Sequence, residues 1–108
     1  MNRHIIPSPD ARADLESIAR WYRRIDANLS RQFRAEARKT LFRIAQFPYA
    51  SLRVNDVVRR VLMARFPYRI DFTFNADILL VISITHQRRA ETVWKDRITR
   101  FAGEGVND

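Results

Sequence analysis

The segment ITHQRRAETVWKDR, residues 84–97, holds side chains whose types and spacing could act on a phosphodiester. A run of aliphatic residues ends at His86, and Arg88, Arg89 and then Trp94 follow it. An unperturbed histidine titrates near neutral pH and can exchange a proton, while arginines stabilise phosphate charge through paired hydrogen bonds. The segment therefore predicts either an acid/base site built on His86 or a cationic surface that only grips a partner.

The histidine and the tryptophan also have simpler interpretations. By strict alternation His86 has the parity of Leu80, Ile82 and Ile84, so it can be the polar end of a buried strand, bonded to the backbone. We prefer this interpretation for a lone histidine. Trp94 is expected to pin the C-terminal piece to the core, and if exposed it would anchor a partner.

The length and composition indicate one globular domain over residues 1–108, with a disordered tail at residues 102–108. The chain is 46% hydrophobic and 30% charged, and it has no apolar run of about 18 residues that could span a membrane. With no cysteine and two histidines, we expect neither a metal nor a cofactor. The N-terminus lacks the apolar core of a secretory signal, which predicts a cytoplasmic protein.

The net charge of +8 comes from 18 arginines and two lysines against 12 acidic residues. This excess favours association with nucleic acid, an acidic protein or an anionic membrane face. The preference for arginine has a second interpretation, codon usage in a GC-rich genome. The arginines of the expected helices are most simply their solvated faces: Arg20, Arg23, Arg24, Arg31, Arg34, Arg38 and Arg43.

Two helices are expected to form an αα-hairpin. Ser8 can cap a helix with Pro9 in its first turn, and apolar residues recur at three- and four-residue spacing over roughly residues 9–25. The segment DANLS interrupts this pattern, and we expect Ser30 to cap a second helix. A loop at residues 49–55 follows the hairpin.

Runs rich in β-formers predict the strands. They cover residues 3–7, 56–63, 68–74 and 77–86. In YRIDFTF the apolar residues alternate with Arg69, Asp71 and Thr73, so one face should pack on the helices and the other should be wetter. The last run is apolar at both parities, as in a buried central strand. A short helix is expected within residues 90–101.

These elements predict an α+β fold in the order β-α-α-β-β-β. The N-terminal strand and the αα-hairpin pack on a small, mainly antiparallel twisted sheet, and a short C-terminal helix or tail follows. This order and two motifs resemble the ParE branch of the RelE/ParE toxins of bacterial toxin–antitoxin pairs, which include plasmid stabilisation proteins. The motifs are RRVLMARFPYRIDFTF and the closing ISITHQRRAETVW.

The resemblance covers most of residues 3–97, and its most specific part is FPY-R-I followed about 18 residues later by H-x-x-R and a tryptophan. Relatives often follow the arginine with an acidic residue and a proline, where this chain has Ala90-Glu91, so the start of the C-terminal piece departs from the family. The resemblance implies a growth-inhibiting toxin held inactive by a cognate antitoxin, whose C-terminal segment wraps around it. RelE-like members cut mRNA in the ribosomal A site, whereas ParE-like members are associated with poisoning DNA gyrase.

A nuclease would need a base for the 2'-hydroxyl, cations for the phosphate charge and a proton donor for the leaving oxygen. The candidates are His86, Asp71, Arg60 and Arg69. Ribosome-dependent relatives use lysines and arginines on the sheet or a Glu-Arg-His/Tyr set, but here the expected sheet has no lysine and no tyrosine follows the last strand. Arg69 and Asp71 can equally form a surface ion pair worth about 0 to 1 kcal/mol. The residues therefore favour a toxin that binds over an enzyme.

Binding, to a target or to the antitoxin, is expected at one cationic edge of the sheet. The residues expected there are Arg59, Arg60, Arg65, Arg69, Arg88 and Arg89, with Trp94. An acidic antitoxin would suit the charge, add a strand to an open sheet edge and lay an amphipathic helix beside the αα-hairpin. The toxin–antitoxin complex is expected to bind operator DNA through the antitoxin.

The first hypothesis is thus a ParE-like toxin that inhibits DNA gyrase by protein contact. The alternative is a ribosome-dependent mRNA endoribonuclease. A third hypothesis is a basic nucleic-acid-binding module, for which the chain lacks a clear recognition helix or stacking platform.

Overall fold

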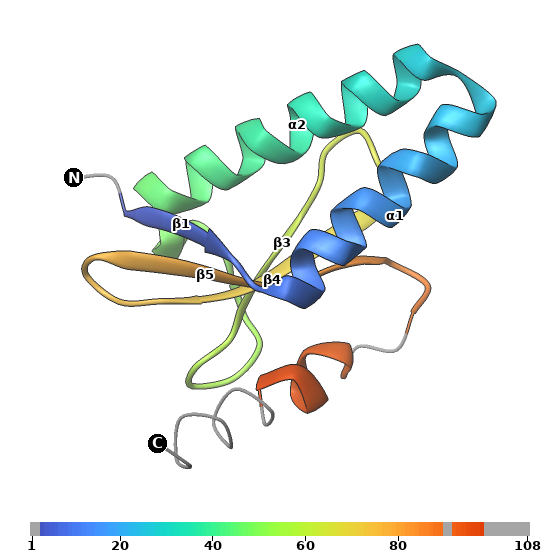
Figure 1. The fold of residues 1–108 in the computed structure, drawn as a ribbon. Helices are drawn as coiled ribbons and strands as arrows, with labels where there is room; N and C mark the ends of the chain where they lie inside the picture. Colours follow the sequence, from blue (N-terminus) through green and yellow to red (C-terminus); the bar gives the residue numbers. More distant parts are fainter. Residues whose placement is uncertain (1–2, 90–91, 99–108) are drawn as a thin grey trace.

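The computed structural model describes residues 3–89 and 92–98, which form an α+β fold with a helical hairpin packed on a five-stranded sheet (Figure 1). The elements are β1 (His4–Pro7), α1 (Pro9–Ile25), α2 (Ala27–Gln46), the 3-10 helix η1 (Pro48–Ala50), β2 (Leu52–Arg53), β3 (Arg59–Leu62), β4 (Tyr68–Phe74) and β5 (Ile78–His86). A short helix at residues 93–98 follows. The expected order is confirmed, with η1 and β2 added in the segment expected to be a loop. The expected tail, residues 102–108, and residues 90–91 and 99–101 of the segment expected to hold the C-terminal helix lie outside the described residues.

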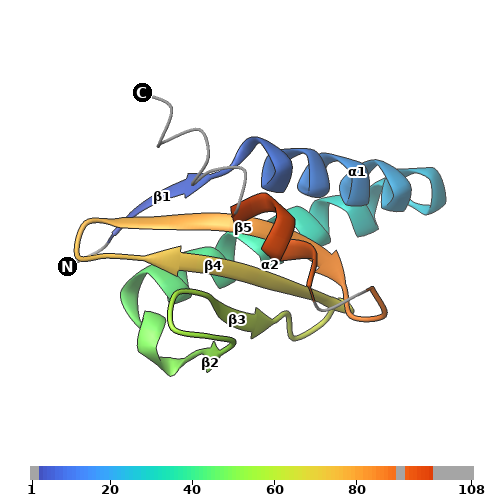
Figure 2. The ribbon, with the colours of Figure 1, turned by 90° about the horizontal axis from the view of Figure 1, so that it is seen from below.

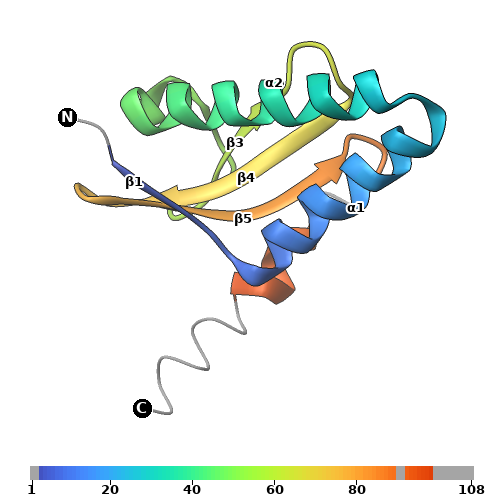
Figure 3. The same cartoon turned by 45° about the horizontal axis from the view of Figure 1, so that its top comes forward.

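The sheet has the strand order β1-β5-β4-β3-β2. β1 runs parallel to β5 and the other neighbours are antiparallel, which confirms the mainly antiparallel sheet. The hairpin covers one face, and the helix at residues 93–98 lies against the other (Figures 2 and 3). β5 is therefore central, as its apolar residues of both parities predict. Over the described ranges, no helix combines the length and apolarity that crossing a membrane requires.

α1 begins where the sequence predicts. The Ser8 hydroxyl accepts a hydrogen bond from the Ala11 N–H at 3.0 Å, and Pro9 occupies the first turn. The same hydroxyl donates to the Ile82 carbonyl of β5 at 3.2 Å. The cap therefore also ties the start of α1 to the sheet.

One residue, Asp26, joins the two helices. Its backbone N–H donates to the Tyr22 carbonyl of α1, and its carboxylate accepts a hydrogen bond from the Asn28 N–H at 2.8 Å. The expected Ser30 cap is wrong, because Asp26 already caps α2 one turn earlier. Ser30 lies buried inside α2, where its hydroxyl donates to the Ala19 carbonyl of α1 at 2.8 Å and holds the hairpin together.

A β-bulge in β5 decides which of its side chains face the helices. Asp71 of β4 pairs with Ser83, but the next residue of β4 pairs with Val81, so Ile82 has no partner on β4. The alternation along β5 reverses at this point. His86 therefore shares a face with Val81, whereas strict alternation predicted opposite faces.

The core lies between the hairpin and the sheet. At one end of the core, the two aromatic rings of the FPY motif pack with two rings from the helices. Tyr22, Phe33, Phe66 and Tyr68 pack mostly edge to face, with ring centroids 5.2 to 6.3 Å apart. Phe66 and Tyr68 are buried while Pro67 between them is exposed. The motif thus anchors the β3–β4 turn in the core by its two aromatic residues.

Candidate functional site

The face of β4 that carries Arg69 and Asp71 is not the wetter face that alternation predicted. The Asp71 side chain is fully buried, and Arg69 is 3% exposed. The expectation is wrong because the helix at residues 93–98 lies against this face (Figure 2). Alternation within one strand says which residues share a face, but it does not say what later covers them.

Asp71 pairs with Arg60 of β3 and not, as the sequence suggested, with Arg69. The β3–β4 register places Arg60 directly opposite Asp71. The Arg60 Nε donates to Oδ1 at 2.7 Å and Nη2 donates to Oδ2 at 3.2 Å, and the Ser83 hydroxyl of β5 contacts Oδ2 at 3.4 Å. This buried bidentate pair joins the three central strands by side-chain bonds.

Arg69 binds the turn that follows β5. Its Nη1 donates to the carbonyl oxygens of His86 and Gln87 at 3.3 and 3.2 Å, and its Nη2 donates to the Arg89 carbonyl at 3.0 Å. Because the side chain is buried, it fixes the main chain of this turn and presents little surface to a partner.

His86 lies at the end of β5 and makes the contacts of a strand-end histidine. Its Nδ1 accepts a hydrogen bond from the Arg88 N–H at 3.1 Å, and its ring lies edge-on to Tyr68 at a centroid distance of 5.3 Å. Burial, and then hydrogen bonding to Tyr22, raises the pKa of Tyr68 to about 12. The ring beside His86 is therefore a neutral phenol near pH 7.

The six arginines expected at one edge of the sheet do not gather there. Arg60 and Arg69 are buried, and Arg59 lies beside the other end of β4, near Phe74. The exposed members Arg65, Arg88 and Arg89 do share one end of the sheet, here named the cationic end. The Gln87 N–H donates to the Pro67 carbonyl at 2.9 Å, which joins the β3–β4 turn to the turn after β5.

Trp94 is half-buried on the helix at residues 93–98, as expected of a packing residue. Arg97 of this helix donates to Asp14 of α1 at 3.0 Å and to the Ile82 carbonyl at 3.2 Å, and the bond to Asp14 raises the pKa of Arg97. Asp14 also accepts a hydrogen bond from the Ile84 N–H at 2.9 Å. These side chains cover the edge of β5 beyond the end of β1.

An apolar groove that the sequence interpretation missed runs between β1 and α2, here named the β1–α2 groove. One part, of about 310 Å³, is lined by Ile5, Leu15, Arg34, Ala37, Arg38, Leu41 and Phe42. A second part, of about 660 Å³, shares Ile5 and Phe42 with the first. The signal in the sequence was Phe42, which falls outside the buried stripe of its helix and is 59% exposed.

Among the described residues, no strand pairs with the edge of β1 beside this groove. Alternate residues of β1 bond to β5, as the His4 N–H does with the Asp77 carbonyl at 2.8 Å. Ile5 therefore directs its backbone groups to the open edge, and Pro7 lacks an N–H, so an added strand would be short.

The model of a protein family matches residues 5–91, and its description is the ParE toxin of the type II toxin–antitoxin system parDE. The chain belongs to this family. It is thus a type II toxin, and membership of this family implies a cognate antitoxin as its partner.

The fold of this ParE-family chain also has solved relatives. It is similar to a chain of the chromosomal ParDE system from P. aeruginosa, with a TM-score of 0.68 and 15% identity over 78% of this chain and 95% of that one. It is similar to a mutant of E. coli toxin RelE in the free state, with a TM-score of 0.59 and 16% identity over 93% of this chain and 98% of that one. Such identities establish a shared fold alone. No curated protein matches the chain.

Proposed function

We propose that this ParE-family toxin arrests growth by binding DNA gyrase through its protein surface and not by cutting mRNA. The observation that carries the proposal is the buried pair between Arg60 and Asp71. A general base must reach the proton that it removes, and the Asp71 carboxylate is fully buried and bonded to Arg60 and Ser83.

The other nuclease candidates are also held in structural contacts. His86 accepts a backbone hydrogen bond at Nδ1, and Arg69 donates to three backbone carbonyls. An arginine keeps its proton too firmly to replace the missing base. Freeing Arg60 or Asp71 for RNA would leave the other buried charge without its counterion, which costs about 3–5 kcal/mol.

The contacts with gyrase come from the cationic end. Arg65, Arg88 and Arg89 are exposed there, and the turn that carries Arg88 and Arg89 is fixed by the buried Arg69. Arginines on a fixed main chain can form charge-assisted hydrogen bonds with acidic groups of a protein at a small entropic cost.

The cognate antitoxin is acidic and occupies the β1–α2 groove. Its apolar residues cover the exposed Phe42, its carboxylates meet Arg34 and Arg38 at the rim, and its backbone pairs with Ile5 on the open edge of β1. The complex contacts operator DNA through the antitoxin, and the toxin acts in the cytoplasm.

The deciding experiment adds the purified toxin to DNA gyrase and, separately, to translating ribosomes. Inhibited supercoiling with intact mRNA is expected, and the double variant Arg88→Gln with Arg89→Gln should lose the inhibition. Arg20→Gln with Arg24→Gln removes the same charge from exposed positions of α1 and serves as the matched control. Unaffected gyrase with codon-positioned cuts in mRNA would establish the ribosome-dependent nuclease in its place.

A further inference from the structure

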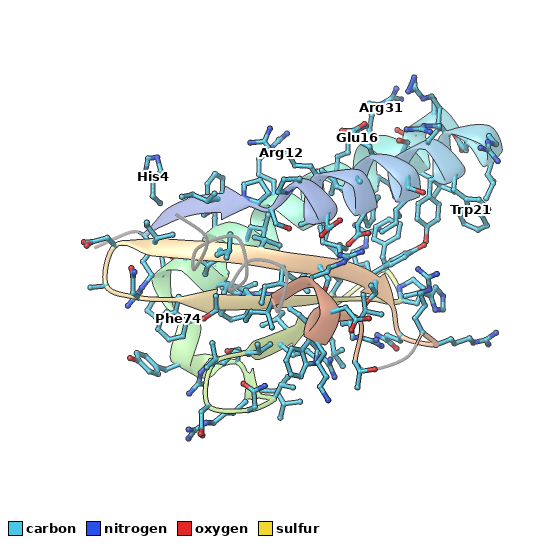
Figure 4. All side chains as sticks on the ribbon, turned by 60° about the horizontal axis from the view of Figure 1, so that its bottom comes forward. His4, Arg12, Glu16, Trp21, Arg31 and Phe74 are labelled. Carbon is cyan, nitrogen blue, oxygen red and sulfur yellow. The ribbon has the colours of Figure 1, made fainter. Side chains whose placement is uncertain are left out.

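A polar pocket of about 570 Å³ lies at the end of β4 away from the cationic end, where Figure 4 labels Phe74. Arginines from three separate segments line it: Arg3 before β1, Arg53 of β2 and Arg59 of β3. The lining also includes the exposed ring of Tyr49. Arg3 also lines the second part of the β1–α2 groove, but neither the proposed gyrase surface nor the proposed antitoxin site accounts for Arg53, Arg59 and Tyr49.

Two adjacent aromatic rings lie between two arginines along the wall of the pocket. The Arg3 Cζ lies 5.1 Å from the ring centroid of Phe74, and the Arg59 Cζ lies 5.2 Å from that of Tyr49. The two rings meet edge to face at 5.0 Å and 86°. Because a cation is attracted to the face of an aromatic ring, each ring holds one guanidinium in place.

Backbone carbonyls hold the same two arginines. The Arg3 Nε donates to the Asn75 carbonyl at 2.6 Å, and its Nη1 donates to the Ala45 carbonyl at 3.2 Å. The Arg59 Nη1 donates to the Ser51 carbonyl at 3.1 Å. A guanidinium has five N–H donors, so Arg3 Nη2 and Arg59 Nη2, which make no hydrogen bond within residues 3–89 and 92–98, can serve a ligand. Both cations are thus preorganised.

Arg53 adds a more adaptable cation. It pairs with Asp56 at 2.9 Å, and the two side chains are 60% and 95% exposed. An exposed pair of this kind is weak, so Arg53 can turn to a ligand at little cost. Three arginines against the one carboxylate of Asp56 leave the lining of the pocket cationic.

We propose that this pocket binds a nucleotide, that is, a phosphate ester carrying a planar base, either free or within a nucleic-acid strand. Planar guanidinium forks match phosphate oxygens, and Arg3 and Arg59 are already fixed at the pocket wall. Tyr49, 73% exposed beside them, offers a ring on which any base can stack. The volume lies within the range of roughly 300–1,000 Å³ of small-molecule sites.

The test measures binding of the purified full chain to a fluorescein-labelled oligothymidylate of about 12 nucleotides, with AMP, inorganic phosphate and a polyglutamate peptide as competitors. Arg59→Gln and Arg53→Gln are each expected to weaken the oligonucleotide and AMP by about tenfold. Tyr49→Leu should weaken AMP more than inorganic phosphate, because it removes the stacking ring while the Ser51 carbonyl still holds Arg59. Because Arg53 and Tyr49 are mostly exposed, their variants are expected to fold even if Arg59→Gln does not.

The matched control is Arg12→Gln on α1, which removes the same charge from an exposed position far from Phe74 in Figure 4. It should change binding less than about twofold.

An equal loss in Arg12→Gln and Arg59→Gln would overturn the proposal in favour of diffuse charge. So would phosphate competing as well as AMP, or polyglutamate competing better. Competition by AMP identifies a free nucleotide as the ligand. Oligonucleotide binding that AMP does not compete with identifies a nucleic-acid strand. Both results support the proposal. Gyrase inhibition is measured separately and does not depend on this site.

Discussion

Arg60 and Asp71 lie directly opposite each other on β3 and β4, and their buried side chains form two parallel hydrogen bonds of 2.7 and 3.2 Å. The carboxylate also contacts the Ser83 hydroxyl of β5 at 3.4 Å, so the three central strands share one polar network under the C-terminal helix. The same two residues would be a base and a cation in a nuclease. Their burial makes the network a structural feature of the sheet.

Replacing Asp71 by asparagine should destabilise the fold by about 3–5 kcal/mol, because Arg60 then stays buried without its carboxylate. Urea denaturation measures the loss. Glu16→Gln removes the carboxylate of an exposed pair with Arg34 and should cost no more than about 1 kcal/mol. The apolar double variant, Arg60→Met with Asp71→Leu, should recover much of the loss. Equal effects of Asp71→Asn and Glu16→Gln would contradict a structural role for the buried pair.

The stability of the fold should fall as the pH rises from about 10 to about 12. Burial raises the pKa of Tyr68 from its ordinary value of 10.0 to about 12, so the folded chain keeps a proton that the unfolded chain has lost. The contribution is complete below about pH 10 and disappears through the window above it. Urea midpoints measured at pH 9, 10 and 11 in the parent and in Tyr68→Phe test this. A parent curve as flat as that of Tyr68→Phe in this window would show that Tyr68 is not responsible.

Arg97→Gln should release the helix at residues 93–98. The substitution removes the charged bonds from Arg97 to Asp14 and exposes the neighbouring Trp94, which is half-buried in the parent. In a Trp21→Phe background, where Trp94 is the one tryptophan, the emission maximum should move to longer wavelength. Bonds to charged groups of this kind contribute about 1.5–3 kcal/mol. Arg24→Gln, a charge-matched change at an exposed position of α1, should leave the emission unchanged, and the same shift in both would exclude a specific tie between Arg97 and Asp14.

Phe42→Glu should abolish rescue by the cognate antitoxin while leaving toxicity intact. Phe42 is 59% exposed in the β1–α2 groove, so the glutamate costs little in the free toxin but repels an acidic antitoxin and removes an apolar contact. Growth of cells that express both proteins measures the effect. Phe47→Glu is the control, since Phe47 is 64% exposed and does not line the groove. Full rescue of Phe42→Glu would remove the groove from the antitoxin interface.

The sequence alone was sufficient for the elements whose signals are local. The Ser8 cap with Pro9, and apolar residues at helical spacing, set α1 at Pro9–Ile25. The alternation in YRIDFTF set β4 at Tyr68–Phe74. Local rules failed at the start of α2, because Asp26 and Ser30 are both residue types that cap helices. Asp26 is the cap, and Ser30 instead bonds to the Ala19 carbonyl of α1, a contact that depends on how the two helices pack.

The candidate site depended on contacts between distant parts of the chain. Both interpretations of His86 were open from the sequence, and the bulge at Ile82 decided which face of the sheet the ring occupies. The sequence supplied the cations and the apolar residues that this family member needs. Only the tertiary structure decided that Arg60 meets Asp71 out of reach of solvent, because strand register and the covering C-terminal helix join residues whose spacing along the chain carries no information about their contact.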